Sequence, residues 1–114
     1  LQANPQVTTQ IVGGTSLSVA KHPTSSTVVL FVHGIGGRRQ NWADQIAAVA
    51  PFATVAAIDL RGYGSSKLGS EQSTVETYCD DISDVAEALQ AKQLVLCGLS
   101  FGAWIVTSIC CEKP

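Results

Sequence analysis

The chain has 114 residues, of which 46% are hydrophobic and 14% are charged, and its formal net charge is -2. This composition excludes a disordered segment, which would be more polar, and it provides no basic surface for nucleic acid or anionic lipid. We expect one domain with a hydrophobic core. No apolar run approaches the roughly 20 residues that a membrane span requires, so we expect no such span. We also expect no signal peptide at residues 1–6.

The first third of the chain predicts a hairpin followed by a buried strand. Residues 7–12 and 17–21 favour two short strands joined through Gly13 and Gly14. Residues 27–32 are almost entirely apolar and β-branched, which is typical of a central parallel strand buried on both faces. This strand leads into a glycine-rich loop at residues 33–37.

A helix is expected after this loop, and a second buried strand follows it. Asn41 is the expected N-cap of the helix, and Trp42, Ile46 and Val49 share one face. Residues 54–58 then have the apolar composition of a buried strand.

The second half repeats the pattern of helix, strand and helix. Residues 73–76 match a capping box and predict a helix with an apolar face and an acidic, solvated face. Residues 93–97 predict a third buried strand, and an apolar helix follows residues 98–102. Strands that alternate with helices predict an α/β fold, with a mostly parallel sheet and helices on both faces.

The cysteines give no metal or disulfide pattern. Cys79, Cys97, Cys110 and Cys111 form no Cys-x-x-Cys pair and have no histidine at a metal-ligand spacing. We interpret them as reduced thiols, which predicts no metal site and favours a cytoplasmic location.

The segment Gly98-Leu99-Ser100-Phe101-Gly102 matches the G-x-S-x-G pattern of a nucleophile elbow. It follows a predicted strand and opens a predicted helix, the setting in which a sharp turn lifts the serine Oγ out of the sheet. Side chains at Gly98 and Gly102 would collide across such a turn, and the N-terminus of the helix offers N–H donors to an oxyanion. The pattern therefore predicts Ser100 as a nucleophile.

The loop at residues 33–37 is expected at the same carboxyl edge of the sheet, outside which ligands of open α/β sheets bind. It contains neither G-x-G-x-x-G nor a P-loop Gly-Lys-Ser/Thr, so the sequence disfavours a nucleotide site. Its glycine-rich backbone instead offers a second N–H to an oxyanion.

Taken in order, His33-Gly34-Ile35-Gly36-Gly37, Trp42, the segment 59–66 and Gly98-Leu99-Ser100-Phe101-Gly102 resemble the α/β-hydrolase superfamily. The likeness extends from about Val7 onward and is strongest to the branch of small esterases, lactonases and C–C hydrolases. The resemblance implies that Ser100 is the nucleophile and that the backbone N–H groups of Ile35 and Phe101 form the oxyanion hole. It also implies that His33, Gly34, Gly98 and Gly102 support these motifs, and that the loop from Asp59 to Gly64 is structural.

The predicted activity is hydrolysis of small carboxylic esters or lactones through an acyl-enzyme, with no cofactor. Serine at the elbow disfavours epoxide hydrolases and haloalkane dehalogenases, which place aspartate there. A C–C bond hydrolase, an amidase, a perhydrolase and a non-catalytic binding protein of the same fold remain alternatives, and the oligomeric state is open.

The chain lacks a complete triad for this chemistry. The family order is Ser, then Asp or Glu, then His. After Ser100 the only acidic residue is Glu112, which is expected about 18 Å away along the helix, and there is no histidine. We therefore expect residues 1–114 to form one incomplete domain, truncated after the helix that follows Ser100. We also expect the strand at residues 93–97 to form a sheet edge that is prone to associate.

Overall fold

The computed structural model describes residues 6–69 and 73–112. The expectations about residues 1–5 and about the end of the chain at residues 113–114 lie outside these ranges. The elements in chain order are β1 (Thr8–Val12), β2 (Thr15–Ala20), β3 (Thr27–Val32), the 3-10 helix η1 (Arg39–Trp42), α1 (Ala43–Val49), β4 (Thr54–Ile58), α2 (Val75–Ala88), β5 (Gln93–Gly98) and α3 (Phe101–Glu112).

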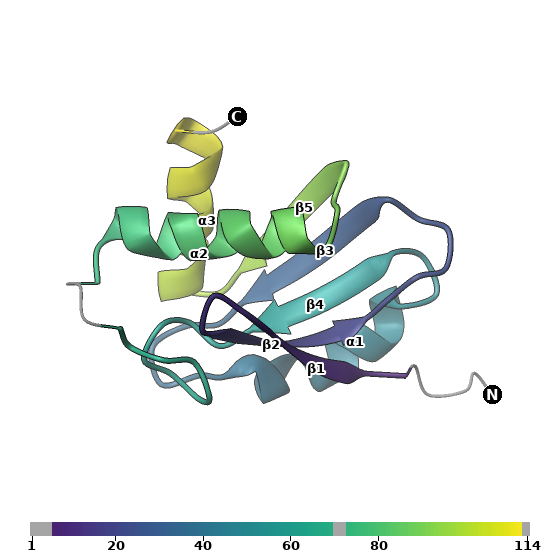
Figure 1. The fold of residues 1–114 in the computed structure, drawn as a ribbon, viewed down its shortest axis with the longest axis horizontal. Coiled ribbons are helices and arrows are strands. Elements are labelled where there is room, and N and C mark those ends of the chain that lie inside the picture. Colours follow the sequence, from purple (N-terminus) through teal and green to yellow (C-terminus); the bar gives the residue numbers. More distant parts are fainter. Residues whose placement is uncertain (1–5, 70–72, 113–114) are drawn as a thin grey trace.

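The strands form one sheet in the order β1-β2-β4-β3-β5 (Figure 1). β2 is antiparallel to both of its neighbours, whereas β3 is parallel to both β4 and β5. It follows that β2 alone runs against the other four strands, and the expected mostly parallel sheet is confirmed.

Helices cover both faces of this sheet, as predicted. Because side chains alternate along a strand, Leu30 and Val32 of β3 face a core formed with α2 and α3. Phe31, between them, faces the opposite core with Ile46 of α1. Figure 1 shows α2 and α3 on one side of the sheet and α1 on the other.

Strand β5 differs from its prediction as a buried strand. Among the described residues it pairs only with β3, so it forms an edge of the sheet, and the Val95 side chain is 49% exposed. Its apolar run does resemble that of a central strand, but burial also needs a neighbour on each side. The expected sheet edge at this strand is confirmed.

Two predicted helix caps are also corrected. Asn41 lies within η1, where its Oδ1 accepts from the Arg38 N–H at 2.9 Å, and Trp42 occupies the N-cap of α1. Helix α2 is capped one residue later than expected, because Thr74 and Thr77 cap each other reciprocally. Threonine hydroxyls here take the places that the pattern assigned to Ser73 and Glu76.

The four cysteines form no disulfide; Cys79 is buried, and Cys97, Cys110 and Cys111 are exposed. Within residues 6–69 and 73–112, no helix has the length and apolar character needed to cross a bilayer.

Candidate active site

The carboxyl ends of β3 and β5 lie side by side and bring two predicted segments together. Val32, the last residue of β3, pairs with Gly98, the last residue of β5. The Leu99 N–H continues this ladder by donating to the Val32 carbonyl at 3.1 Å. The loops at residues 33–37 and 98–102 therefore leave the sheet at adjacent points. Because β3 lies between β4 and β5, the connection that leaves β3 leads to one side of it and the connection that leaves β4 leads to the other. Ligands of open α/β sheets bind where the connections diverge in this way.

Ser100 sits in a strained turn between β5 and α3. Its φ is +57°, in the left-handed region that a residue with a side chain adopts at an energetic cost. The Gly102 N–H donates to the Leu99 carbonyl at 3.0 Å and closes the turn. Ser100 is exposed, so its hydroxyl is available outside the carboxyl edge of the sheet.

Both glycines of the motif are sterically required. A Cβ at Gly98 would lie 2.4 Å from the carbonyl oxygen of Gly102, across the turn. A Cβ at Gly102 would lie 2.2 Å from the carbonyl oxygen of Val32. The first turn of α3 therefore packs directly on the backbone of β3, an approach that only glycine permits.

The glycine-rich loop lies against Ser100 from the other side. The Gly37 N–H donates to the Gly34 carbonyl at 3.0 Å, and Gly36 has a φ of +79°. A Cβ at Gly34 would lie 3.3 Å from Ser100 Cβ and 3.0 Å from the Leu99 carbonyl oxygen. The bare backbone of Gly34 is thus in close contact with the elbow.

Two backbone N–H groups near Ser100 have no intramolecular use. Within residues 6–69 and 73–112, neither the Ile35 nor the Phe101 amide donates to a protein acceptor. Ile35 follows the glycine that contacts Ser100, and Phe101 follows Ser100 itself at the N-terminus of α3. Amides at such positions are available to an anion or a carbonyl oxygen of a ligand.

His33 is 2% exposed, and both of its ring nitrogens are engaged. Its Nε2 accepts from the Leu60 N–H at 2.9 Å, so Nδ1 carries the proton and donates to the Gly34 carbonyl at 2.7 Å. The Tyr63 ring packs edge-on against it, at 5.0 Å between centroids. The imidazole ties its loop to the segment after β4 and has no free nitrogen for proton transfer.

The hollow beside Ser100 has a volume of about 320 Å³. Its lining consists of residues 33–37 together with Asn41, Trp42, Leu99 and Ser100. The Trp42 ring stacks on Phe31 at 4.8 Å between centroids, which anchors it to the sheet. Sequence reasoning assigned no role in a binding surface to Trp42 or Leu99, because only the tertiary structure brings η1 next to the elbow.

The sequence also gave no reason to single out Arg39, whose guanidinium is buried against Asp59. Asp59 is fully buried, accepts from the Arg39 backbone N–H at 2.7 Å and forms an ion pair with the Arg39 guanidinium. The Ser65 N–H donates to the same carboxylate at 3.1 Å. These contacts join η1 to the loop after β4, and they fit the structural role expected for that loop.

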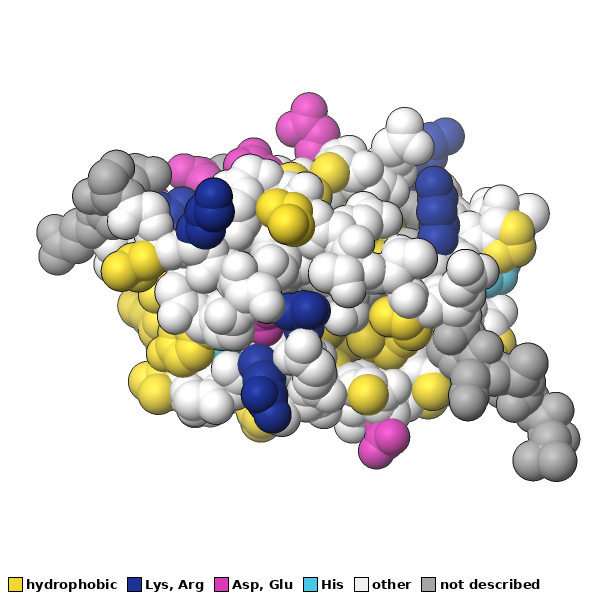
Figure 2. All heavy atoms as spheres, turned by 60° about the horizontal axis from the view of Figure 1, so that its bottom comes forward, with side chains coloured by type: hydrophobic (Ala, Val, Ile, Leu, Met, Phe, Trp, Pro, Cys, Tyr) yellow, Lys and Arg dark blue, Asp and Glu magenta, His cyan; other side chains and the backbone are white. Residues whose placement is uncertain are grey.

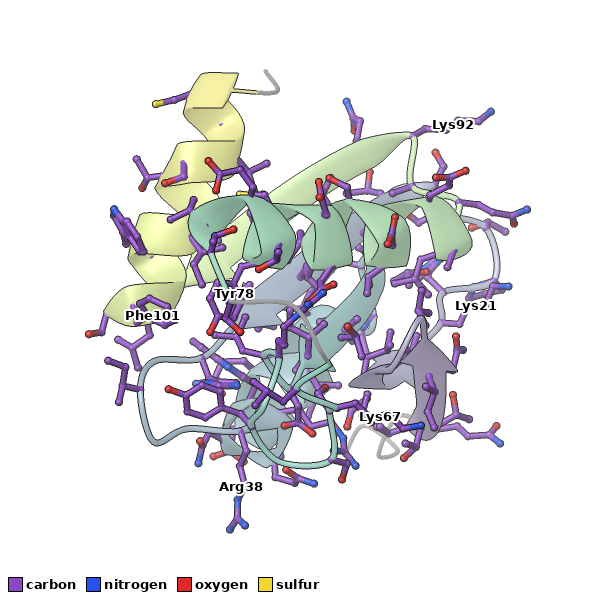
Figure 3. The ribbon with its side chains drawn as sticks, turned by 60° about the vertical axis from the view of Figure 1, so that its left-hand side comes forward. Lys21, Arg38, Lys67, Tyr78, Lys92 and Phe101 are labelled. Atoms are coloured by element: carbon purple, nitrogen blue, oxygen red, sulfur yellow. The ribbon has the colours of Figure 1, made fainter. Side chains whose placement is uncertain are left out.

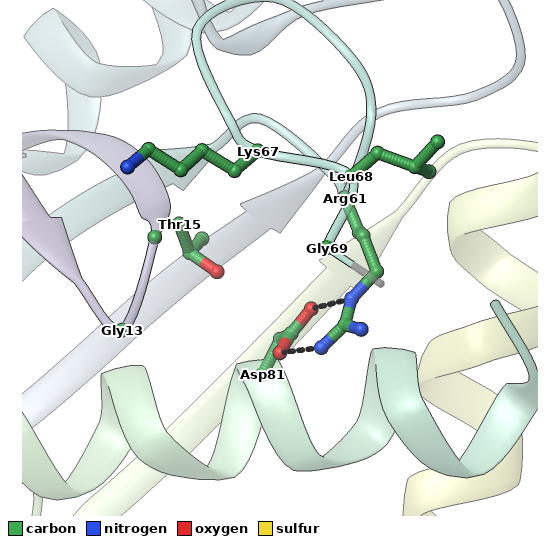
Figure 4. A pocket seen from close by; sticks show the side chains of 8 residues that line it. Gly13, Thr15, Arg61, Lys67, Leu68, Gly69 and Asp81 are labelled. Atoms are coloured by element: carbon green, nitrogen blue, oxygen red, sulfur yellow. Dashed lines mark hydrogen bonds and ion pairs between the residues drawn. The ribbon is translucent and has the colours of Figure 1, made fainter. Parts of the chain in front are cut away.

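A second pocket, of about 240 Å³, lies away from Ser100 between the β1–β2 turn and the loop that begins at Arg61 (Figure 4). Arg61 forms a two-pronged ion pair there with Asp81 of α2, with N–O distances of 3.0 and 2.8 Å. On the predicted acidic face of α2, Asp84 and Glu87 are exposed, whereas Asp81 is held in this ion pair. Among the described residues, the lining of this pocket includes the Asp81 carboxylate but no serine and no histidine.

In the part of the chain that the structure describes, no three His, Cys, Asp or Glu side chains lie in a group able to hold a metal ion.

Comparison with known proteins gives a consistent pattern. Residues 27–114 match a model of the alpha/beta hydrolase fold. The chain is 33% identical over 99 residues to an abhydrolase domain-containing protein of Caenorhabditis elegans, covering 83% of this chain and 21% of that protein. It is 30% identical over 90 residues to 3-oxoadipate enol-lactonase 1 of Acinetobacter baylyi, covering 78% of this chain and 34% of that enzyme.

The structure superposes on an epoxide hydrolase of Vigna radiata with a TM-score of 0.79 and 28% identity, covering 96% of this chain and 36% of the other. The chain thus spans about a fifth to a third of the curated relatives named above.

Proposed function

The chain belongs to the alpha/beta hydrolase fold family, and from this we propose that the protein is a serine hydrolase of carboxylic esters or lactones with Ser100 as its nucleophile. The observation that carries the proposal is the conformation of Ser100. An exposed serine with a φ of +57° stands between a strand and a helix, next to two amides that have no acceptor in the part of the protein that the structure describes. Positive-φ strain at a residue without an evident structural need is typical of functional sites.

In the proposed reaction, Ser100 Oγ attacks the substrate carbonyl carbon and loses its proton to a general base. The carbonyl π electrons move to oxygen, and the oxyanion accepts hydrogen bonds from the Ile35 and Phe101 amides. The C–O bond to the leaving alcohol then breaks, and that alcohol takes up the proton. Water releases the acyl group from Ser100 by the same steps in reverse order.

The base is proposed to come from chain beyond Ser100. His33 is unsuited to the role, because both of its nitrogens are used within the protein. His22 lies between β2 and β3, at the amino edge of the parallel strands, and its Nδ1 accepts from the Ser25 N–H at 3.0 Å. The family order of Ser, acid and His therefore predicts an acid and then a histidine after residue 114.

The serine also supports acyl transfer over the epoxide chemistry named for one structural relative. An epoxide is opened by attack on a saturated carbon, which generates no carbonyl oxyanion, whereas serine catalysis exploits two amide donors directed at such an oxygen. We therefore propose the ester or lactone class, with a small molecule as the substrate.

The test has two parts. The natural coding sequence is read beyond the codon for Pro114 for an acid followed by a histidine in frame. The protein expressed from that complete sequence is then treated with a fluorophosphonate, and its mass is measured intact. We expect one adduct, located at Ser100, and loss of both labelling and ester hydrolysis in Ser100→Ala. A stop codon directly after Pro114, or labelling that persists in Ser100→Ala, contradicts the proposal.

We further propose a cytoplasmic location, which the three exposed thiols support, since surface thiols persist in reducing compartments. Cell fractionation of the native protein tests this, and recovery in an oxidising compartment contradicts it.

A further inference from the structure

The hollow beside Ser100 has no charged side chain among its described lining residues. The His33 ring in this lining has both of its nitrogens engaged within the protein, one by the Leu60 N–H and one by the Gly34 carbonyl. The rest of the lining consists of glycine backbone, one amide, one hydroxyl and three apolar side chains.

The apolar side chains at this hollow are unusually exposed. Ile35 is 77% exposed and Leu99 is 62% exposed, although both lie next to functional backbone groups. Figure 2 shows hydrophobic side chains gathered at the left-hand end of the molecule, the end at which β3 and β4 terminate in Figure 1. Apolar groups that rim a hollow favour an apolar ligand, because its contact removes their surface from water.

The nearest positive charges along the chain are not directed into the hollow. Arg39 is buried in its ion pair with Asp59. Arg38 is exposed, and Figure 3 shows it pointing away from the rest of the molecule. The partial positive charge at the N-terminus of α3 lies at the Phe101 amide, where the proposed oxyanion accepts its hydrogen bond.

We propose that the substrate group that fills this hollow is uncharged and apolar, so that Ser100 acts on esters or lactones of aliphatic acids and discriminates against acyl groups that bear a carboxylate. The inference rests on the proposed function and specifies its substrate class. A carboxylate placed in the hollow loses its hydration and gains no cation from the described lining, which raises the energy of that complex.

A binding experiment tests the inference independently of catalysis, on the 114-residue chain itself. The variant Trp104→Phe leaves Trp42, which lines the hollow, as the only tryptophan. Its fluorescence is titrated with hexanamide and with the adipic acid monoamide anion, which have the same chain length. We expect hexanamide to bind at least about tenfold more tightly. Equal binding, tighter binding of the anion, or no response to either ligand overturns the inference.

A kinetic experiment on the protein expressed from the complete coding sequence adds a second readout. It compares kcat/KM for p-nitrophenyl hexanoate and for the mono-p-nitrophenyl ester of adipic acid. We expect a preference of about 100-fold for the hexanoate, whereas a ratio near one or below overturns the inference. Loss of both rates in Ser100→Ala supports the proposed function whatever the ratio, so the two proposals fail separately.

A pair of matched variants locates the effect. Leu99→Lys introduces a cation at the rim of the hollow, and we expect it to raise the relative kcat/KM for the adipate ester about threefold to fivefold at low salt, and less at high salt. Leu68→Lys makes the same change at a leucine that is 59% exposed and lines the other pocket, and it should leave the ratio unchanged. An equal effect of both variants points to net charge alone and overturns the assignment to the hollow.

Discussion

At the scale of single residues, the site depends on one unfavourable backbone conformation. Ser100 and Gln90 are the described non-glycine residues with positive φ, and only Ser100 stands beside unengaged amides. Gln90 follows the C-cap of α2, where a left-handed residue commonly ends a helix, so its conformation has a structural explanation. Ser100 opens a helix and has no such explanation, which supports a functional reason for its strain.

This conformation predicts how substitutions at Ser100 affect stability. Ser100→Gly removes the contact between a Cβ and its own backbone, whereas Ser100→Ala removes the hydroxyl and keeps that Cβ. We expect Ser100→Gly to exceed Ser100→Ala in free energy of unfolding by about 1 kcal/mol, although glycine gains entropy in the unfolded chain. Chemical denaturation of both variants measures the difference, and a less stable Ser100→Gly would count against stored strain.

At the scale of elements, the direction of α3 is set by its contact with β3. Gly102 lies in the first turn of α3, and a Cβ added there would lie 2.2 Å from the Val32 carbonyl oxygen and 2.6 Å from that of His33. The neighbouring residue, Phe101, packs edge-on against Tyr78 of α2, at 5.5 Å between centroids, as Figure 3 indicates. A helix held at both of these points keeps its first amide beside the hollow.

We expect Gly102→Ala to lower the free energy of unfolding by about 3 kcal/mol, because its Cβ would lie 2.2 Å from a main-chain oxygen that has no room to move. The matched control is Gly13→Ala in the β1–β2 turn, where φ is +57° but the space around a Cβ is open. That change should cost only about 1 kcal/mol, from backbone strain. Equal losses in denaturant unfolding would show that the close packing of α3 on β3 is not limiting.

At the scale of the whole molecule, the sheet is open at β5. The strand has hydrogen-bonding groups along its outer side, and Val95 and Leu99 near it expose large apolar side chains. An exposed apolar edge of this kind pairs readily with another strand. We therefore expect the 114-residue chain to associate with itself through this edge as its concentration rises.

Val95→Lys should shift this association to at least about tenfold higher protein concentration, because a charge on an edge strand opposes pairing. Phe52→Lys is the control, since it removes a side chain that is 78% exposed in the turn between α1 and β4. Sedimentation velocity over a concentration series distinguishes the two variants. A chain that stays monomeric throughout, or an equal response to both variants, rules out pairing through β5.

The sequence by itself determined the order of the strands and helices and the place of the turn between β5 and α3. The bounds of β3 and β4 are those predicted, because a continuous β-branched run between polar turns has few alternatives to a central strand. Gly98 and Gly102 identified the turn, because glycine is required at positions where a side chain would collide with the backbone. Local patterns of this kind require no knowledge of which element is a neighbour.

Only the tertiary structure decided which elements meet. The burial of β5 depends on a neighbouring strand, so its apolar sequence predicted more burial than this chain provides. The pair of Arg39 and Asp59, 20 positions apart, and the position of Trp42 beside Ser100 follow from strand order, which no local pattern encodes. The charge-free hollow is likewise a property of the assembled sheet edge, because it depends on where Arg38 and Arg39 are directed rather than on their presence in the sequence.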